Sequence, residues 1–232
     1  MGYEDRRGLR QVLCAMTLLS YNLIIMFFLS HSDGDLKWCE KALEEQLNLY
    51  PEGVWFLFLK ARLEFTRGNL DECIQWYTKS WKSQHIWPQF HNLCFWELMW
   101  AHCVKQEWSI ALPFAETLSR ESNWSPTIYL YQQAAITLMM RPLSAEQMAT
   151  VDQLMTKAPT HKQRIAGKSL PMEKFVIKKT DRYFAQKKSL VLPVFELMYL
   201  WNLFRIVGKH NDLLLAVFKT IEEEESRLAG AP

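Results

Sequence analysis

The sequence predicts an all-α fold, a right-handed superhelix of stacked antiparallel helix hairpins. A small side chain returns at intervals of 34, 38 and 38 residues, at Cys39, Cys73, Ala111 and Ala149. Each apolar pattern of helical period around these positions is followed by a proline, at Pro51, Pro88, Pro126 and Pro159. Repeats of this length mark helix hairpins that bury their apolar faces against their neighbours. We therefore expect a single α-solenoid domain over residues 1–232.

The composition favours a folded helical protein and excludes several function classes. Hydrophobic residues make up 49% of the 232 residues, and 8 glycines and 9 prolines are few for an all-β chain. The net charge of +2 is too small to indicate nucleic-acid binding. Five cysteines without a C-x-x-C pair argue against a disulfide framework and a zinc site, and are typical of a reducing compartment. We expect a cytoplasmic protein.

The N-terminal stretch 11–30 contains no charged residue and leaves three interpretations open. It is long enough to span a bilayer, and Arg6, Arg7 and Arg10 precede it. Polar residues at its middle, Ser20-Tyr21-Asn22, suit a buried helix of the repeat domain equally well. A cleaved signal peptide is the third interpretation. Ser-Asp-Gly-Asp at 32–35 then offers turn and cap residues for a second helix.

The second hairpin has the clearest pattern. Apolar residues and Arg62 follow 3–4 spacing over 54–66, and Gly68-Asn69 ends that helix. Asp71-Glu72 open the next helix, where acidic side chains suit the positive helix N-terminus. Applied to the whole chain, the same reasoning predicts hairpins at about 9–49, 53–83, 89–121, 126–158 and 190–229. In the last of these, the first helix is expected over 192–207.

A basic connector over 159–189 separates the fourth and fifth hairpins. Ten Lys or Arg lie between Lys157 and Lys188, against Glu173 and Asp181. An acidic run follows at 222–225. We interpret both as solvated surfaces; binding to an acidic partner or to anionic lipid is the alternative for the basic one.

Several segments resemble known repeat proteins. The turn at 68–73, Gly-Asn-Leu-Asp-Glu-Cys, resembles the Gly-Asp-Tyr-Glu-Glu-Ala turn of tetratricopeptide repeats. Three longer segments are similar to the tetratricopeptide repeat protein 39 family: QFHNLCFWELMW at 89–100, IAGKSLP at 165–171 and LMYLWN at 197–202. The resemblance covers about Leu9 to Gly208. It implies a non-enzymatic helical repeat protein and a link to lipid or sterol homeostasis or to cilia. Members are usually longer, and the resemblance carries no site residues.

The sequence contains no convincing catalytic or cofactor site. Ala166-Gly167-Lys168-Ser169 resembles the end of a phosphate-binding loop, but Lys162 stands where the first glycine is needed. His102, Cys103 and Cys94 lack the further donors that a metal site requires. We expect no enzyme activity, no cofactor and no metal. Cys103 or Lys168 would have to carry any activity.

The expected function is a scaffold that binds a segment of another protein. The first helix of each hairpin lines the concave surface in this architecture. Its polar and charged residues are the candidate binding residues: Lys60, Glu64, Arg67, His91, Glu97 and Lys105. Aromatic residues, among them Trp87, Trp96, Trp100, Trp108 and Trp124, are expected in the core, with a peptide-binding groove as the alternative. The alternative function is a membrane-associated protein anchored by residues 11–30.

Overall fold

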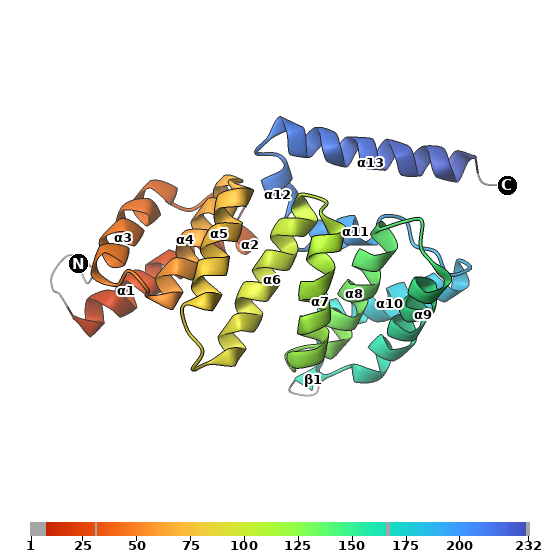
Figure 1. Ribbon diagram of the computed structural model, residues 1–232, viewed down its shortest axis with the longest axis horizontal. Coiled ribbons are helices and arrows are strands. Elements are labelled where there is room, and N and C mark those ends of the chain that lie inside the picture. The colour runs from red at the N-terminus through yellow and green to blue at the C-terminus, as the bar shows by residue number, and fades with distance from the viewer. Residues whose placement is uncertain (1–7, 31, 166–167, 231–232) are drawn as a thin grey trace. The chain divides into compact units, whose positions relative to one another are not determined.

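The computed structural model describes residues 8–30, 32–165 and 168–230 and is helical almost throughout (Figure 1). Its contacts form two compact units. Unit 1 is Met1–Cys94 with Trp201–Asn211, and unit 2 is Phe95–Leu200 with Asp212–Pro232. Consecutive helices pack in pairs within each unit, which confirms the predicted helical repeat fold. The superhelical hand and the single domain concern both units together and stay predictions.

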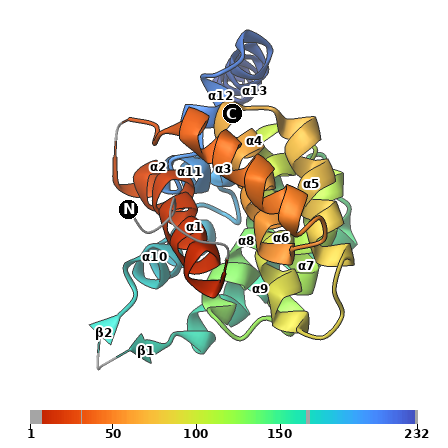
Figure 2. The same ribbon diagram turned by 90° about the vertical axis from the view of Figure 1, so that its left-hand side faces the viewer.

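Unit 1 is built around α4 (Val54–Arg67), which packs against the helices before and after it in the chain (Figure 2). Nearly all residues of α4 from Phe56 to Thr66 are buried. The other elements of unit 1 are α1 (Leu9–Ser20), the π-helix η1 (Tyr21–Ile25), α2 (Met26–Leu29), α3 (Leu36–Leu49), α5 (Leu70–Lys82), the start of α6 (Pro88–Val104) and α12 (Phe204–Val207). A helix buried on most sides needs apolar residues all round, and the sequence of α4 supplies them.

The predicted cap residues begin and end these helices. Asp35 is the N-cap of α3, and its Oδ1 accepts a hydrogen bond of 2.9 Å from the Trp38 amide. Gly68 ends α4 with φ +88°, a conformation that glycine adopts without a Cβ clash. A Cβ at this position would come within 2.8 Å of the His210 ring. The turn between α4 and α5 therefore requires glycine for two separate reasons.

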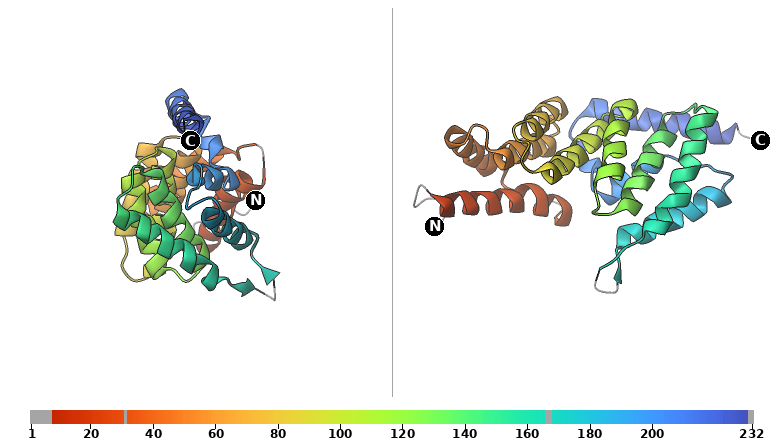
Figure 3. Two further views of the ribbon diagram at one scale, coloured as in Figure 1. Left: turned by 90° about the vertical axis from the view of Figure 1, so that its right-hand side faces the viewer. Right: turned by 60° about the horizontal axis from the view of Figure 1, so that its bottom comes forward.

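The N-terminal stretch forms one continuous helical rod from α1 through η1 to α2 (Figure 3, right). One stripe of it is buried against the rest of unit 1, and its residues recur every fourth position: Ala15, Leu19, Leu23 and Phe27. The other side stays apolar and exposed, with Leu13 54% and Ile25 45% accessible. Thus one side of residues 11–30 is packed, as expected for a helix of the repeat domain, and the other side is an exposed apolar surface.

Two arginines of unit 1 bind the C-terminal half of this rod. Arg62 of α4 is 2% exposed, and its Nε donates to the Leu23 carbonyl at 3.2 Å. Its guanidinium lies 4.4 Å from the centre of the Phe27 ring. Arg205 donates to the Phe27 and Ser30 carbonyls at 3.1 and 3.0 Å. The bonds from Arg205 satisfy carbonyls that the end of a helix leaves unpaired.

Unit 2 repeats the paired arrangement around α8 (Pro126–Met139), which packs against α7 (Trp108–Glu121) and α9 (Ala145–Lys157). Two later helices, α10 (Pro171–Ala185) and α11 (Pro193–Leu200), also pack on α8. Ser144 caps α9 in a capping box with Gln147. The long C-terminal helix α13 (Asn211–Ala229) completes the unit.

The range 159–189, expected as a connector, contains ordered elements. The 3₁₀ turn η2 (Ala158–His161) leads to two short antiparallel strands, β1 (Arg164–Ile165) and β2 (Lys168–Ser169), paired as Arg164 with Ser169 (Figure 2). Helix α10 then fills 171–185. Within the loop motif 166–169, residues 166 and 167 lie outside the described residues, as do the side chains at 168 and 169.

The prediction of one continuous helix over 192–207, as the first helix of the fifth hairpin, is wrong. The chain forms α11, a turn and then α12, which belongs to unit 1 while α11 and α13 belong to unit 2. Asn202 in the turn has φ +59°, and its side-chain amide donates to the Phe27 carbonyl at 2.7 Å. The bond to a residue 175 positions away stabilises the break, and Asn tolerates the left-handed conformation better than most residues.

The small-residue repeat holds for three positions and fails at the fourth. Cys39, Cys73 and Ala111 are completely buried, whereas Ala149 is exposed. In α9 the buried positions are Val151 and Met155. An interval of 38 residues therefore selects the exposed face of α9.

Candidate functional site

Three of the predicted binding residues, Lys60, Glu64 and Arg67, contact one another on α4. Glu64 Oε1 lies 2.6 Å from Lys60 Nζ and 3.3 Å from Arg67 Nη1. The two terminal nitrogens of Arg67 also bind both carboxylate oxygens of Glu40 on α3, each at 2.8 Å. Only 2% of the Glu64 side chain is exposed. This network joins α3 to α4, so its charges are already engaged within unit 1.

The pKa shifts in this network follow from the Arg67–Glu40 contact. The hydrogen bond from Arg67 is the main cause that lowers the pKa of Glu40. The same bond raises the pKa of Arg67. Both groups therefore stay charged across the physiological range, which suits a structural ion pair.

The other three predicted residues lie along or just after α6 and do not join this network. His91 is in unit 1, where its Nε2 lies 2.8 Å from the Gln84 carbonyl. Glu97 and Lys105 belong to unit 2; Glu97 is half-buried, and Lys105 Nζ lies 2.8 Å from Glu107. A binding face made of all six residues stays a prediction.

The tryptophans divide between core and surface. Trp100 is 3% exposed, as the core interpretation expects. Trp87 and Trp124 are 48% and 56% exposed, and each lies in the loop just before the first helix of a hairpin. Trp87 packs on Trp55 with ring centres 6.0 Å apart, and Trp124 packs on Trp96 at 6.4 Å. Equivalent loops of two consecutive hairpins thus present a half-exposed indole on an aromatic base.

Hydrogen bonds order both loops. Trp87 and Gln84 exchange two bonds, of 2.8 and 2.9 Å, between the Gln84 side chain and the Trp87 backbone. Ser125, next to Trp124, donates to the buried carboxylate of Glu173 at 2.8 Å. These bonds fix the backbone of the loops, and the ring contacts restrain the indoles, so a partner that covers them costs little conformational freedom.

The side chains considered for catalysis are buried or bound to neighbouring side chains. Cys103 is completely buried, and burial raises the pKa of its thiol, so it stays protonated and a poor nucleophile. His102 Nδ1 lies 2.7 Å from Glu107 Oε2, and its ring stacks on Phe114. Among the described residues, no group of three His, Cys, Asp or Glu could hold a metal ion.

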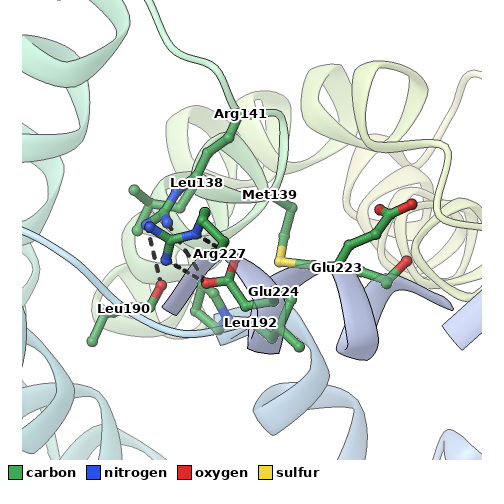
Figure 4. A pocket seen from close by; sticks show the side chains of 10 residues that line it. Leu138, Met139, Arg141, Leu190, Leu192, Glu223, Glu224 and Arg227 are labelled. Atoms are coloured by element: carbon green, nitrogen blue, oxygen red, sulfur yellow. Dashed lines mark hydrogen bonds and ion pairs between the residues drawn. The ribbon is translucent and has the colours of Figure 1, made fainter. Parts of the chain in front are cut away.

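A cavity of about 230 Å³ in unit 2 lies beneath α13 (Figure 4). Its charged residues bind one another: Arg227 holds the Glu224 carboxylate through two bonds of 2.7 Å, and Arg141 lies 3.7 Å from the same group. The bond from Arg227 lowers the pKa of Glu224. Arg141 also donates to the Leu190 carbonyl at 3.2 Å. We interpret these residues as an anchor for α13, because the carboxylate already occupies both guanidinium groups.

Helix 9–29 is the one candidate membrane span among the described residues, judged by length and apolar composition. Only 22% of the 18-residue stretch that meets this test is buried. The core helix of a soluble protein and a signal sequence pass the same test, so this finding alone does not separate the three interpretations of residues 11–30.

Comparison with known proteins gives one family. The family described as Iml2/Tetratricopeptide repeat protein 39 matches residues 2–230. Tetratricopeptide repeat protein ttc-39B of Caenorhabditis elegans is 33% identical over 211 residues, which cover 90% of this chain and 36% of that protein. The chain thus spans about a third of the length of this relative. No solved structure matches the chain.

Proposed function

Because the chain belongs to the Iml2/tetratricopeptide repeat protein 39 family, we propose that it is a non-enzymatic cytosolic scaffold that binds segments of other proteins. The observation that supports this most is the pair of half-exposed tryptophans, Trp87 and Trp124. Tryptophan is over-represented among the residues that dominate binding energy at protein interfaces. A role in lipid homeostasis or cilia, implied by the family resemblance, stays a prediction.

The tryptophans are a sharper test of this proposal than the charged residues of α4. Lys60→Glu would place a second carboxylate beside the buried Glu64, so a loss of binding would report damage to the fold. Trp87 and Trp124 lie in loops and are about half exposed, so we expect their truncation to disturb the helices less than a second carboxylate beside Glu64 would.

We expect Trp87→Ala/Trp124→Ala to lose most of the proteins that the wild-type chain captures from a cell extract, because each truncation removes a large apolar contact. The measurement is quantitative mass spectrometry of the captured proteins. Tyr199→Ala is the matched control, since Tyr199 is 75% exposed on α11 and lies in neither loop. An unchanged set of captured proteins in the tryptophan variant would contradict the proposed contact residues.

Membrane attachment through residues 11–30 is a second candidate function. It is favoured by the exposed apolar side of helix 9–29, with Leu9 74% and Leu29 84% accessible. A membrane-spanning position would remove the Leu23 and Phe27 carbonyls from Arg62, Asn202 and Arg205. Arg62, which is buried, and the partly buried Asn202 and Arg205 would then lack these acceptors, which is costly.

We therefore expect the full chain, expressed in cells, to be released into the supernatant by alkaline carbonate extraction. A spanning helix stays in the membrane pellet under these conditions. Retention in the pellet would support the anchor and contradict the packing of helix 9–29 described above. An established transmembrane protein and a cytosolic protein from the same extract serve as controls.

A further inference from the structure

Helix α13 carries an exposed apolar stripe that the scaffold proposal does not use. Its residues are Leu214, Phe218, Ile221 and Leu228, which are 52%, 56%, 42% and 46% exposed. They are spaced by 4, 3 and 7 positions. Glu225 lies 4 positions after Ile221 and 3 before Leu228, so it continues the same spacing. Spacing of this kind forms a narrow straight seam and is typical of a helix that packs along one other helix.

The flank of α13 next to the seam is held to unit 2, so the seam cannot turn inward. Val217 is buried, Thr220 Oγ1 lies 2.6 Å from Gln106 Oε1, and Glu224 is bound as shown in Figure 4. The seam residues 218, 221 and 225 each follow one of these anchored residues. One position turns an α-helix by about 100°. The seam therefore runs beside the packed face and is presented to solvent on a fixed helix.

The charges next to the seam are negative. Glu225 lies within the seam, and Glu222 borders it; in the described part of the chain, Lys219 pairs with Glu223 and Arg227 with Glu224, and neither Glu222 nor Glu225 forms an ion pair. Helix α13 as a whole contains five acidic and two basic residues, a net charge of −3. A partner helix with basic residues beside its apolar stripe would gain from these carboxylates. A second copy of the same helix would bring together two negative seams.

We propose that the seam of α13 binds an amphipathic helix of another protein whose apolar residues follow 3–4 spacing and are flanked by Lys or Arg. This inference rests on the proposed scaffold function and names a surface and a class of partner for it. Apolar contact along the seam supplies affinity, and Glu222 and Glu225 select a basic partner over a neutral or acidic one.

The probe is a fluorescent synthetic peptide of about three heptads, with Leu at 3–4 spacing and Lys beside the seam. Fluorescence anisotropy measures its affinity for the full chain. Two matched peptides are a scrambled one of the same composition and one with Glu in place of Lys. We expect the designed peptide to bind at least about tenfold more tightly than either.

Two pairs of variants test which residues are used. Phe218→Ser/Ile221→Ser should weaken binding at least about tenfold, while Leu215→Ser, 66% exposed but off the seam, should stay near wild type. Glu222→Gln/Glu225→Gln should weaken binding and flatten its salt dependence, whereas Glu223→Gln should not. Circular dichroism checks that each variant keeps its helix content.

Three results would overturn the proposal. They are equal affinity for the designed and scrambled peptides, unchanged affinity of Phe218→Ser/Ile221→Ser, and self-association of the chain through α13 in analytical ultracentrifugation. Capture that depends on Trp87 and Trp124 is measured separately. If capture depends on the two tryptophans but the peptide does not bind, the seam alone is refuted. If capture is unchanged in the tryptophan variant, the scaffold contacts are refuted and the peptide result still stands.

Discussion

Arg62→Ala is expected to lower the free energy of unfolding of unit 1 by about 3 to 5 kcal/mol. Arg62 is among the largest completely enclosed side chains of the molecule. Its removal leaves a cavity between α4 and the N-terminal rod, leaves the Leu23 carbonyl without this donor, and removes the ring contacts to Phe27 and Phe65. The rod should then separate from α4 before the rest of the unit unfolds.

Arg62→Met is the control for this prediction because it keeps most of the volume and removes the charge and the hydrogen bonds. Its expected cost is smaller, about 1 to 2 kcal/mol. Hydrogen exchange followed by mass spectrometry measures both variants and reports residues 9–29 and 54–67 separately. Protection of 9–29 that is equal in Arg62→Ala and wild type would show that the arginine does not hold the rod.

Glu173→Ala is expected to lower the free energy of unfolding of unit 2 by about 3 kcal/mol. Glu173 of α10 is completely buried and accepts hydrogen bonds from the Ser125 hydroxyl at 2.8 Å and from the Gln163 backbone amide at 2.9 Å. Ser125 is the N-cap residue of α8, and Gln163 directly precedes β1. The carboxylate thus joins three segments, and alanine would leave the buried Ser125 hydroxyl and the Gln163 backbone amide without this acceptor.

Glu173→Gln keeps the shape and one acceptor oxygen, so its expected cost is about 1 kcal/mol. Differential scanning calorimetry of both variants gives the loss of stability. Hydrogen exchange in 158–165 and 126–139 shows whether it is local to the joined segments. Equal stability of Glu173→Ala and wild type would contradict the role assigned to the carboxylate.

The helices with strong local signals could be predicted from the sequence. The break at Gly68 and the start at Asp35 depend on residues within one or two turns, so the 3–4 spacing and the cap residues sufficed to place α3, α4 and α5. The break at Asn202 could not be predicted in this way. It is stabilised by a contact with Phe27, and nothing near position 202 indicates that partner.

The candidate binding residues show the same division. Lys60 and Glu64 are four positions apart on one helix, a spacing that by itself indicates an ion pair. The contact of Arg67 with Glu40 crosses between helices and was not accessible to sequence reasoning. The exposure of Trp87 and Trp124 could not be predicted either, because a tryptophan one or two positions before a proline has the same local sequence whether it is covered or not. The 3–4 spacing of the apolar residues in the seam of α13 is visible in the sequence. The same spacing is found on a buried helix face, so it does not predict that the seam is exposed.

The affinity of one purified partner segment for this chain tests the account most directly. Once capture has identified such a segment, titration calorimetry compares its binding to wild type, to Trp87→Ala/Trp124→Ala and to Tyr199→Ala. The account predicts binding at least about tenfold weaker in the tryptophan variant and unchanged in the tyrosine variant. Equal affinity for all three proteins would contradict it.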